Sequence, residues 1–387
     1  MIYLDNSATT PVHPEVLTML TDVIEQCYGN PSSLHNMGVK AERLVEQARK
    51  VVAEALEATP QEILFTSGGT EANNMAIRGI VEQYQSRGKH IITTMVEHPS
   101  VFEVFTYLEK QGFRVTYLPV DEVGRIRLHE LEEAMTDETI LVSIMHVNNE
   151  VGTVQPIEEI GAILERYPKT LFHVDAVQSY GKIPLSVRKA KVDALSLSAH
   201  KLHGPKGTGA LYLRKHVVIK PLLIGGGQEN GMRSGTHNVP GIAGLAKATI
   251  LAKKEQERRM NQFQLWKERF IETIMDKLDH VIVNGDQTQA GGAPYIINLS
   301  FSGMKSEVLV HALETEHVLV SSKSACSSKN ERASRVLSAM GLSDEVATSS
   351  IRISMGYQTE EQDIMDCVKA LERVVPNLQQ VMKVRRK

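Results

Sequence analysis

The chain has 387 residues, more than a single hydrophobic core usually organises, so we expect two lobes. Hydrophobic residues make up 42% and charged residues 23% of the chain, which are ordinary proportions for a globular enzyme. The formal net charge of -3 argues against nucleic acid as the main ligand, and the absence of a long apolar run argues against a membrane span.

Neither the N-terminus nor the cysteines indicate an extracellular protein. Residues 1–5 lack the basic start and apolar core of a secretory signal, so we expect a cytoplasmic location. Cys27, Cys326 and Cys367 are odd in number and far apart. This spacing speaks against a disulfide framework and against a cysteine zinc site.

The first structured elements lead to a candidate phosphate site. A short extended piece, residues 2–11, precedes helical patterns at 14–28 and 41–56, and 63–66 is the first predicted core strand. The next helix begins at Gly69 and Thr70, where convergent backbone amides, the helix dipole and a hydroxyl can hold a phosphate. The motif alone is weak, because many helices begin this way without a ligand.

Strands and helices then alternate, which predicts an α/β fold with a mainly parallel sheet and helices on both faces. Ligands of such sheets collect at the carboxyl ends of the strands. Polar residues follow the predicted strands at those ends, and we expect them to meet at one rim: His98, Asn148, Asp175, Gln178, Ser198, His200 and Lys201.

Two of these rim residues have complementary chemistry. Lys201 follows the strand 193–198, where a partly desolvated amine can form a Schiff base with an aldehyde cofactor. Asp175 ends the strand 171–174, where its carboxylate can keep a pyridine nitrogen protonated. Either residue alone is more simply a surface lysine or a capping aspartate, but the pair fits pyridoxal phosphate chemistry.

The histidines at the rim allow more than one interpretation. His98 precedes a helix and can lie flat on a planar ring, although a capping or core role fits the sequence equally well. His200 and His203 have a spacing that could suggest a metal site. Gly204 and Pro205 break any helix that would align them and no third ligand is near, so we predict no metal.

The second half of the chain contains a glycine-rich loop, a long helix and the second lobe. The loop 224–236 resembles a shaped anion-binding loop more than a flexible tether. The helical pattern 239–278 is long enough to predict a bent or broken helix passing between the lobes. Strands are expected near 281–283, 296–300 and 350–354.

Cys326 is the cysteine most suited to reaction. It lies in a polar loop between two lysines, Lys323 and Lys329, ahead of a helix predicted near Arg332, and these positive groups favour its thiolate. Cys367 lies in an apolar run instead. We therefore predict a reactive cysteine on a mobile loop.

Eight motifs spread over nearly the whole chain closely resemble those of the NifS/IscS-type cysteine desulfurases, which are fold-type I pyridoxal phosphate enzymes of the class-V aminotransferase family. No single motif is specific, but together they are. They are Leu-Asp-Asn-Ser-Ala-Thr-Thr-Pro11, Thr-Ser-Gly-Gly-Thr-Glu71, His-Val-Asn-Asn-Glu150, His-Val-Asp-Ala-Val-Gln178, Ser-Ala-His-Lys201, Arg-Ser-Gly-Thr236, Ser-Ala-Cys326 and Ser-Ile-Arg352.

The resemblance implies a fold and a set of roles. The fold would have a large cofactor-binding domain at 13–258, and a smaller α+β domain from 1–12 and 259–387 that carries the cysteine loop at about 321–333. Lys201 would hold the cofactor as a Schiff base, Asp175 would pair with the pyridine nitrogen, and His98 would stack on the ring. The other implied contacts are Asn148 and Gln178 at the phenolic side, Gly69, Thr70, Ser198 and His200 at the phosphate, Thr236 from a neighbouring subunit of a homodimer, and Arg352, with Asn148, at the substrate.

The implied reaction converts L-cysteine to L-alanine. Lys201 would take the α-proton, and the Cys326 thiolate would attack the substrate sulfur, become a persulfide and pass sulfur to an acceptor for iron–sulfur cluster assembly or tRNA thiolation. The sequence does not say which acceptor is used. Lys323, the run Cys-Ser-Ser-Lys329, and Gln228 in place of a common histidine depart from the family pattern and could alter loop mobility or acceptor choice.

Three other functions remain open from the sequence. A selenocysteine lyase or an aminotransferase could use the same fold, although a transaminase has no need of a loop thiolate. A non-catalytic sulfur-scaffold or regulatory protein could keep the fold without turnover, although the presence of both Lys201 and Asp175 argues against it.

Overall fold

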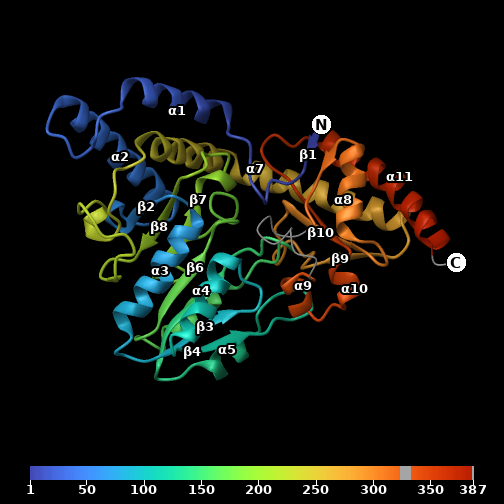
Figure 1. The fold of residues 1–387 in the computed structure, drawn as a ribbon, viewed down its shortest axis with the longest axis horizontal. Coiled ribbons are helices and arrows are strands. Elements are labelled where there is room, and N and C mark those ends of the chain that lie inside the picture. Colours follow the sequence, from blue (N-terminus) through green and yellow to red (C-terminus); the bar gives the residue numbers. More distant parts are fainter. Residues whose placement is uncertain (323–332, 386–387) are drawn as a thin grey trace.

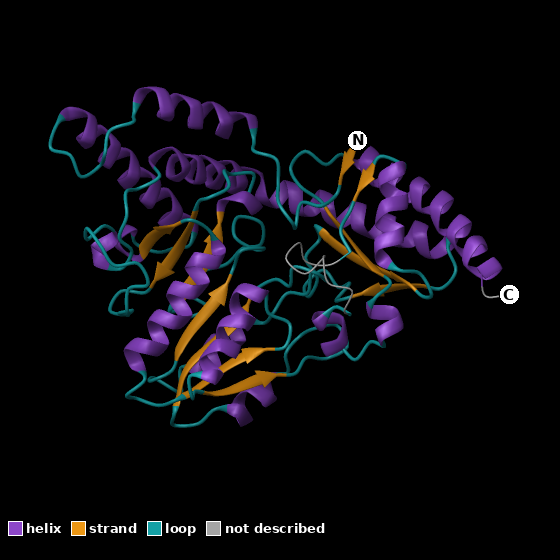
Figure 2. Cartoon of the chain, viewed as in Figure 1, coloured by secondary structure: helices purple, strands orange, loops and turns teal. Residues whose placement is uncertain are grey.

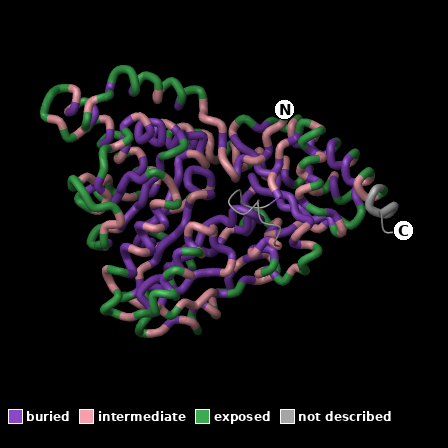
Figure 3. Tube along the Cα trace, in the orientation of Figure 1, coloured by how far each residue is buried: buried purple, intermediate pink, exposed green. Residues whose placement is uncertain are grey.

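The computed structural model describes residues 1–322 and 333–385 (Figure 1). Cys326 and the other residues of 323–332 therefore lie outside the described chain. Two lobes are joined by one long helix, and burial is concentrated in the interior of each lobe (Figure 3). Among the described residues, no helix combines the length and the apolar character needed to cross a membrane.

A seven-stranded sheet forms the centre of the large lobe. Its order is β2 (Ile63–Thr66), β8 (Gly209–Leu213), β7 (Ala194–Ser198), β6 (Leu171–Asp175), β5 (Thr139–Met145), β3 (His90–Thr94) and β4 (Arg114–Leu118). All pairings are parallel except those of β8, which runs antiparallel to β2 and β7. The predicted α/β class with a mainly parallel sheet is confirmed.

Helices cover both faces of this sheet, as Figure 2 shows. On one face, α3 (Gly69–Tyr84) and α4 (Pro99–Lys110) pack their apolar residues on β3, β5 and β7. A second cluster fills the other face beneath α1 (Pro14–Gln26), α2 (Asn36–Ala55) and α6 (Ile157–Leu164). The short helix α5 (Leu128–Ala134) packs beside β4. Strands buried on both faces explain the continuous apolar runs in the sequence.

The small lobe has its own hydrophobic cluster. An antiparallel sheet of β12 (Ser350–Ser354), β10 (Ile296–Phe301) and β9 (Val281–Asn284) packs against α8 (Ser306–Thr315) and α11 (Glu361–Arg385). The strand β1 (Ile2–Tyr3) pairs in parallel with β11 (Val318–Leu319) in the same lobe. Two short helices, α9 (Arg335–Ala339) and α10 (Asp344–Ala347), follow β11 in the described chain.

The helix α7 (Val239–Lys277) passes between the lobes without interruption. Its first half packs into the large-lobe core through Val239 and Ala252, and its second half packs into the small-lobe core through Phe263 and Ile274. The prediction of a bent or broken helix passing between the lobes is confirmed in its passage and wrong as to a break, because one continuous helix packs into both cores. Bending of this helix stays a prediction. The predicted domain boundary at residue 258 falls inside this helix and stays a prediction.

The N-terminal strap, defined as residues 4–10, connects the small lobe to the site. Leu4 belongs to the small-lobe core, and Asp5 forms a parallel bridge with Ser354 of β12. At the other end, Thr10 donates its backbone N–H and its hydroxyl to the carbonyl of His200 in the large lobe, at 3.0 and 2.9 Å. The strap therefore crosses the junction between the lobes.

Candidate active site

A pocket lies at the carboxyl ends of the parallel strands, between the two lobes and beside the N-terminal strap. The large lobe supplies most of its wall, the strap closes one side, and Arg352 enters from the small lobe. Its lining residues are Ser7, Ala8, Gly69, Thr70, His98, Ser100, Met145, Asn149, Asp175, Val177, Gln178, Ser198, His200, Lys201 and Arg352.

Lys201 ends a single 3-10 turn, η2 (Ala199–Lys201), that directly follows β7. Its Nζ donates to the carbonyl oxygens of Ser7 at 2.5 Å and Ala8 at 2.6 Å. Two strap carbonyls thus fix the amine at the wall of the pocket. The strand-end position of this lysine, which the sequence predicts, places it next to a segment 194 residues earlier in the chain.

Asp175 is the last residue of β6, and its carboxylate is buried. Its Oδ2 accepts a hydrogen bond from Asn73 Nδ2 at 2.8 Å, and its Oδ1 accepts one from the backbone N–H of Val177 at 2.9 Å. Burial raises the pKa of Asp175, while these hydrogen bonds and the charge of Lys201 oppose the rise. A positively charged ring nitrogen beside this carboxylate would offset the cost of its burial.

His98 caps the N-terminus of α4, as one of its two possible roles requires, and it also lines the pocket. Its stacking on a planar ring stays a prediction. Its Nδ1 lies 2.8 Å from Ser100 Oγ. Burial, followed by the charges of Lys201, Arg335 and Arg352, lowers the pKa of His98 to about 4. The imidazole is therefore neutral at neutral pH, which suits the predicted stacking of His98 on a cofactor ring.

A polar chain connects this histidine to the buried carboxylate. Asn73 Nδ2 donates both to Ser100 Oγ at 2.9 Å and to Asp175 Oδ2 at 2.8 Å, while Ser100 Oγ lies next to the ring of His98. The orientation of the histidine and that of the carboxylate are thereby coupled. The sequence analysis missed Asn73, since an asparagine inside a helix carries no motif.

The helix start that the sequence predicts to bind phosphate lies in the wall of the pocket, where Gly69 and Thr70 begin α3. Gly68 caps the helix with φ +152°, a conformation that side-chain-bearing residues rarely adopt. A Cβ on Gly69 would lie only 2.6 Å from Val177 Cγ2, so the chain is close-packed at this turn. Thr70, Ser198 and His200 line the same pocket, and Ser198 Oγ is buried with no hydrogen-bond partner among the described residues.

Three predicted site residues are not among the described residues that line the pocket. Asn148 does not line the pocket: its Oδ1 accepts from the N–H groups of Glu150 and Val151, and its Nδ2 donates to the carbonyl of Val96. The contacts predicted for Asn148 are therefore corrected, since its neighbour Asn149 lines the pocket instead. Thr236 is exposed and is not part of this pocket in the single chain. Cys326 lies outside the described residues.

Ser7 and Ala8 of the strap line the pocket, although the sequence placed them only in an extended piece and a family motif and assigned them no contact. Their backbone carbonyls bind Lys201, and that of Ser7 also accepts from Gln178 Nε2 at 2.9 Å. Backbone carbonyls act whatever side chain they carry, so composition gives no sign of them. The available signals were the cluster of turn-forming residues at 5–11 and the family motif that ends at Pro11.

The residues fit pyridoxal phosphate. The pocket combines an amine, a buried carboxylate, a neutral imidazole and a helix N-terminus, and it contains buried polar atoms that lack partners among the described residues: Ser7 Oγ, Gln178 Oε1, Ser198 Oγ and Arg352 Nε. A ligand rich in hydrogen-bonding groups would satisfy such atoms. In the described part of the chain, no group of three or more His, Cys, Asp or Glu residues could hold a metal ion.

The chain is similar to known proteins over nearly its whole length. The family model "Aminotransferase class-V" matches residues 2–366. "Cysteine desulfurase IscS" of Dictyoglomus turgidum is 44% identical over 380 residues, covering 98% of this chain and 96% of that protein. Among solved structures, a "NifS-like protein" superposes with a TM-score of 0.91 at 39% identity, covering 97% of this chain and 99% of its own. Another, "SspA in complex with cysteine", has a TM-score of 0.80 at 36% identity and covers 92% of this chain and 99% of its own.

Proposed function

We propose a role in sulfur transfer for each residue of the pocket. The chain belongs to the class-V aminotransferases, and like its IscS relatives it is a pyridoxal phosphate-dependent cysteine desulfurase. Its substrate is L-cysteine, and its sulfur goes to an acceptor protein. The observation that supports the residue roles below is the convergence of Lys201, Asp175, His98 and Arg352 on one pocket.

The cofactor would be held by the pocket residues already described. Lys201 would bind its aldehyde carbon, Asp175 would lie against its ring nitrogen, and His98 would lie against the face of its ring. Gly69, Thr70, Ser198 and His200 would bind its phosphate, and Gln178 and Asn149 would serve the remaining polar edge. When bound, pyridoxal phosphate supplies an electron sink for the bond changes at the substrate.

Two residues would act directly on L-cysteine. Arg352 is 1% exposed, and its guanidinium would bind the substrate carboxylate. Lys201, once displaced by the substrate amine, would be free to accept the α-proton. Its hydrogen bonds to the strap carbonyls hold the amine at the wall of the same pocket that Asp175 lines.

Cys326 would receive the sulfur. Its thiolate attacks the sulfur of the substrate, so a sulfur–sulfur bond forms as the carbon–sulfur bond breaks. The electron pair of the broken bond stays with carbon, which is protonated to give alanine. The sequence around this residue, with Lys323 and Lys329, favours the thiolate that this step requires.

We further propose that the enzyme works as a cytoplasmic homodimer. In this assembly Thr236, which is exposed in the single chain, would reach the phosphate site of the neighbouring subunit. The persulfide would be delivered to an iron–sulfur scaffold protein or to a tRNA thiolation enzyme. Incubation with labelled cysteine and each candidate acceptor would identify which of them takes up the label.

The experiment that tests the role of Cys326 is its replacement by serine. The Cys326→Ser enzyme should keep the yellow absorbance of the bound cofactor but lose sulfide release from L-cysteine in the presence of a thiol reductant. Cys27→Ser is the matched control, because Cys27 is buried away from the pocket and should leave sulfide release unchanged. Undiminished sulfide from Cys326→Ser would refute the role.

A further inference from the structure

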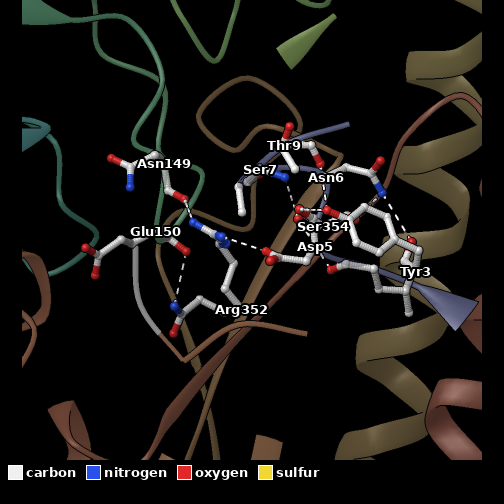
Figure 4. A network of polar contacts seen from close by, with 12 residues as sticks. Tyr3, Asp5, Asn6, Ser7, Thr9, Asn149, Glu150, Arg352 and Ser354 are labelled. Atoms are coloured by element: carbon white, nitrogen blue, oxygen red, sulfur yellow. Dashed lines mark hydrogen bonds and ion pairs between the residues drawn. The ribbon is translucent and has the colours of Figure 1, made fainter. Parts of the chain in front are cut away.

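An ion pair joins the N-terminal strap to the arginine of the site. Asp5 Oδ1 lies 2.8 Å from Arg352 Nη2, although the two residues are 347 positions apart in the chain (Figure 4). The arginine side chain is 1% exposed and the aspartate side chain 19% exposed. The pair is therefore largely shielded from water, and its geometry depends on the fold.

The backbone around Asp5 is fixed by several hydrogen bonds. Ser354 lies two residues after Arg352 on β12; its Oγ accepts from the N–H of Ser7 at 2.8 Å, and its carbonyl accepts from Asn6 Nδ2 at 2.9 Å. Tyr3 donates its hydroxyl to the carbonyl of Asp5 at 3.2 Å. Figure 4 shows these contacts surrounding the aspartate. The Asp5 carboxylate is consequently held at one place relative to β12.

The Arg352 guanidinium has N–H groups that bind no acceptor among the described residues. A guanidinium has five N–H groups. Arg352 Nη1 donates to the carbonyl of Asn149 at 2.8 Å, and Nη2 donates to Asp5. Its Nε is buried with no partner in the described chain, and the residue lines the pocket. Donors are therefore left for one further acceptor, such as a carboxylate.

We propose that Asp5 is a positioning residue for substrate binding: together with the Asn149 carbonyl it holds the Arg352 guanidinium in the orientation that presents its remaining donors to the carboxylate of an amino acid in the pocket. This proposal rests on the substrate-binding role of Arg352 in the proposed function. Without Asp5, the guanidinium keeps, among the described residues, only its hydrogen bond to the Asn149 carbonyl and can rotate about it.

The test compares two ligands that differ only in the carboxylate. L-alanine carries it and ethylamine lacks it, and the binding of either to the holoenzyme is followed by titrating the cofactor absorbance. Asp5→Ala should weaken L-alanine binding by roughly tenfold to a hundredfold, the value of a hydrogen bond to a charged group. Ethylamine binding should change by less than about twofold. Asp5→Asn, which retains an oxygen acceptor, should stay within about threefold of the wild type for L-alanine.

Several outcomes would overturn the proposal. Asp5→Ala could bind L-alanine as the wild type does, or weaken both ligands equally, which would indicate general damage to the pocket. Asp5→Asn could also be as weak as Asp5→Ala. If Asp5→Ala fails to retain the cofactor, Asp5→Glu replaces it: moving the carboxylate by one methylene should weaken L-alanine but not ethylamine, and unchanged L-alanine binding would count against the proposal.

Arg352→Lys distinguishes the proposed role of Asp5 from the proposed binding of the substrate carboxylate by Arg352. If the lysine variant binds L-alanine as well as the wild type, Arg352 does not bind the substrate carboxylate, and both ideas fail. If Arg352→Lys weakens L-alanine while Asp5→Ala does not, the role of Arg352 stands and only that of Asp5 is refuted.

Discussion

Arg49 on α2 allows a matched test of how much burial adds to an ion pair. Its Nη1 lies 2.7 Å from Glu229 Oε2, and its Nε lies 3.0 Å from Glu46 Oε1. The side chain of Glu229 is 1% exposed and that of Glu46 is 58% exposed. The same arginine thus has one buried and one exposed partner, at similar distances.

The buried partner should contribute far more to stability. Burial tends to raise the pKa of Glu229, but hydrogen bonds from His237 and Arg49 and the charge of Arg49 outweigh it and leave this pKa below its ordinary value. Because it is lowered, the contribution is present at neutral pH and lost as the pH falls through the folded-state pKa. Glu229→Gln should lower the free energy of unfolding by about 3 kcal/mol, since it removes the buried partner of Arg49 and leaves, among the described residues, only the exposed carboxylate of Glu46. Glu46→Gln should cost about 0.5 kcal/mol or less.

The assay is urea unfolding followed by circular dichroism at neutral pH. Protein and cofactor concentrations must be the same for every variant, because ligand binding and assembly shift the apparent stability. Equal losses for the two variants would refute the reasoning. Glu229 also lies in the loop that carries Thr236, with φ +48°, so weaker cofactor retention should accompany the loss in Glu229→Gln only.

Two further predictions concern the pocket. Asp175→Asn should lower the rate of alanine formation from cysteine by about a hundredfold or more, because a charge fixed beside the reacting groups is lost. Asp193→Asn, also at a buried carboxylate, is the control and should keep the wild-type rate. Equal rates for the two variants would contradict the proposed role of Asp175. Burial raises the pKa of Glu97 from 4.5 to about 8. Between these two pH values the native state keeps a proton that the unfolded state releases. The free energy of unfolding therefore falls as the pH rises through this range, by up to about 1.4 kcal/mol per pH unit. Urea unfolding of Glu97→Gln should show a flatter pH dependence, and an unchanged slope would count against it.

The sequence predicts well which residues lie at the carboxyl ends of the strands, because this depends on the order of the elements along the chain. Lys201 and Asp175 follow adjacent parallel strands and therefore meet, whatever the details of packing. The choice between Asn148 and Asn149 could not be made in this way. Which of two adjacent asparagines faces the pocket is decided by the turn, where Asn148 is used to bind two backbone N–H groups.

Contacts between distant segments were the least predictable. The strap binds Lys201 through carbonyls, and its aspartate binds an arginine of the small lobe. Neither contact leaves a periodic pattern or a spacing in the chain. The sequence left open whether α7 is bent or broken for a related reason, since only the arrangement of both cores shows that one continuous helix packs into each of them.

The partners of the strap impose an order on biosynthesis. Ile2 pairs with Val318 and Asp5 bridges Ser354, so these two residues wait for partners that are synthesised 316 (318 − 2) and 349 (354 − 5) residues later. At roughly 5 to 20 residues per second, that delay is roughly 15 to 70 seconds. The large lobe can fold during this time, but the wall formed by Ser7 and Ala8 cannot be in place. A nascent chain should therefore capture its cofactor securely only after β12 has been synthesised.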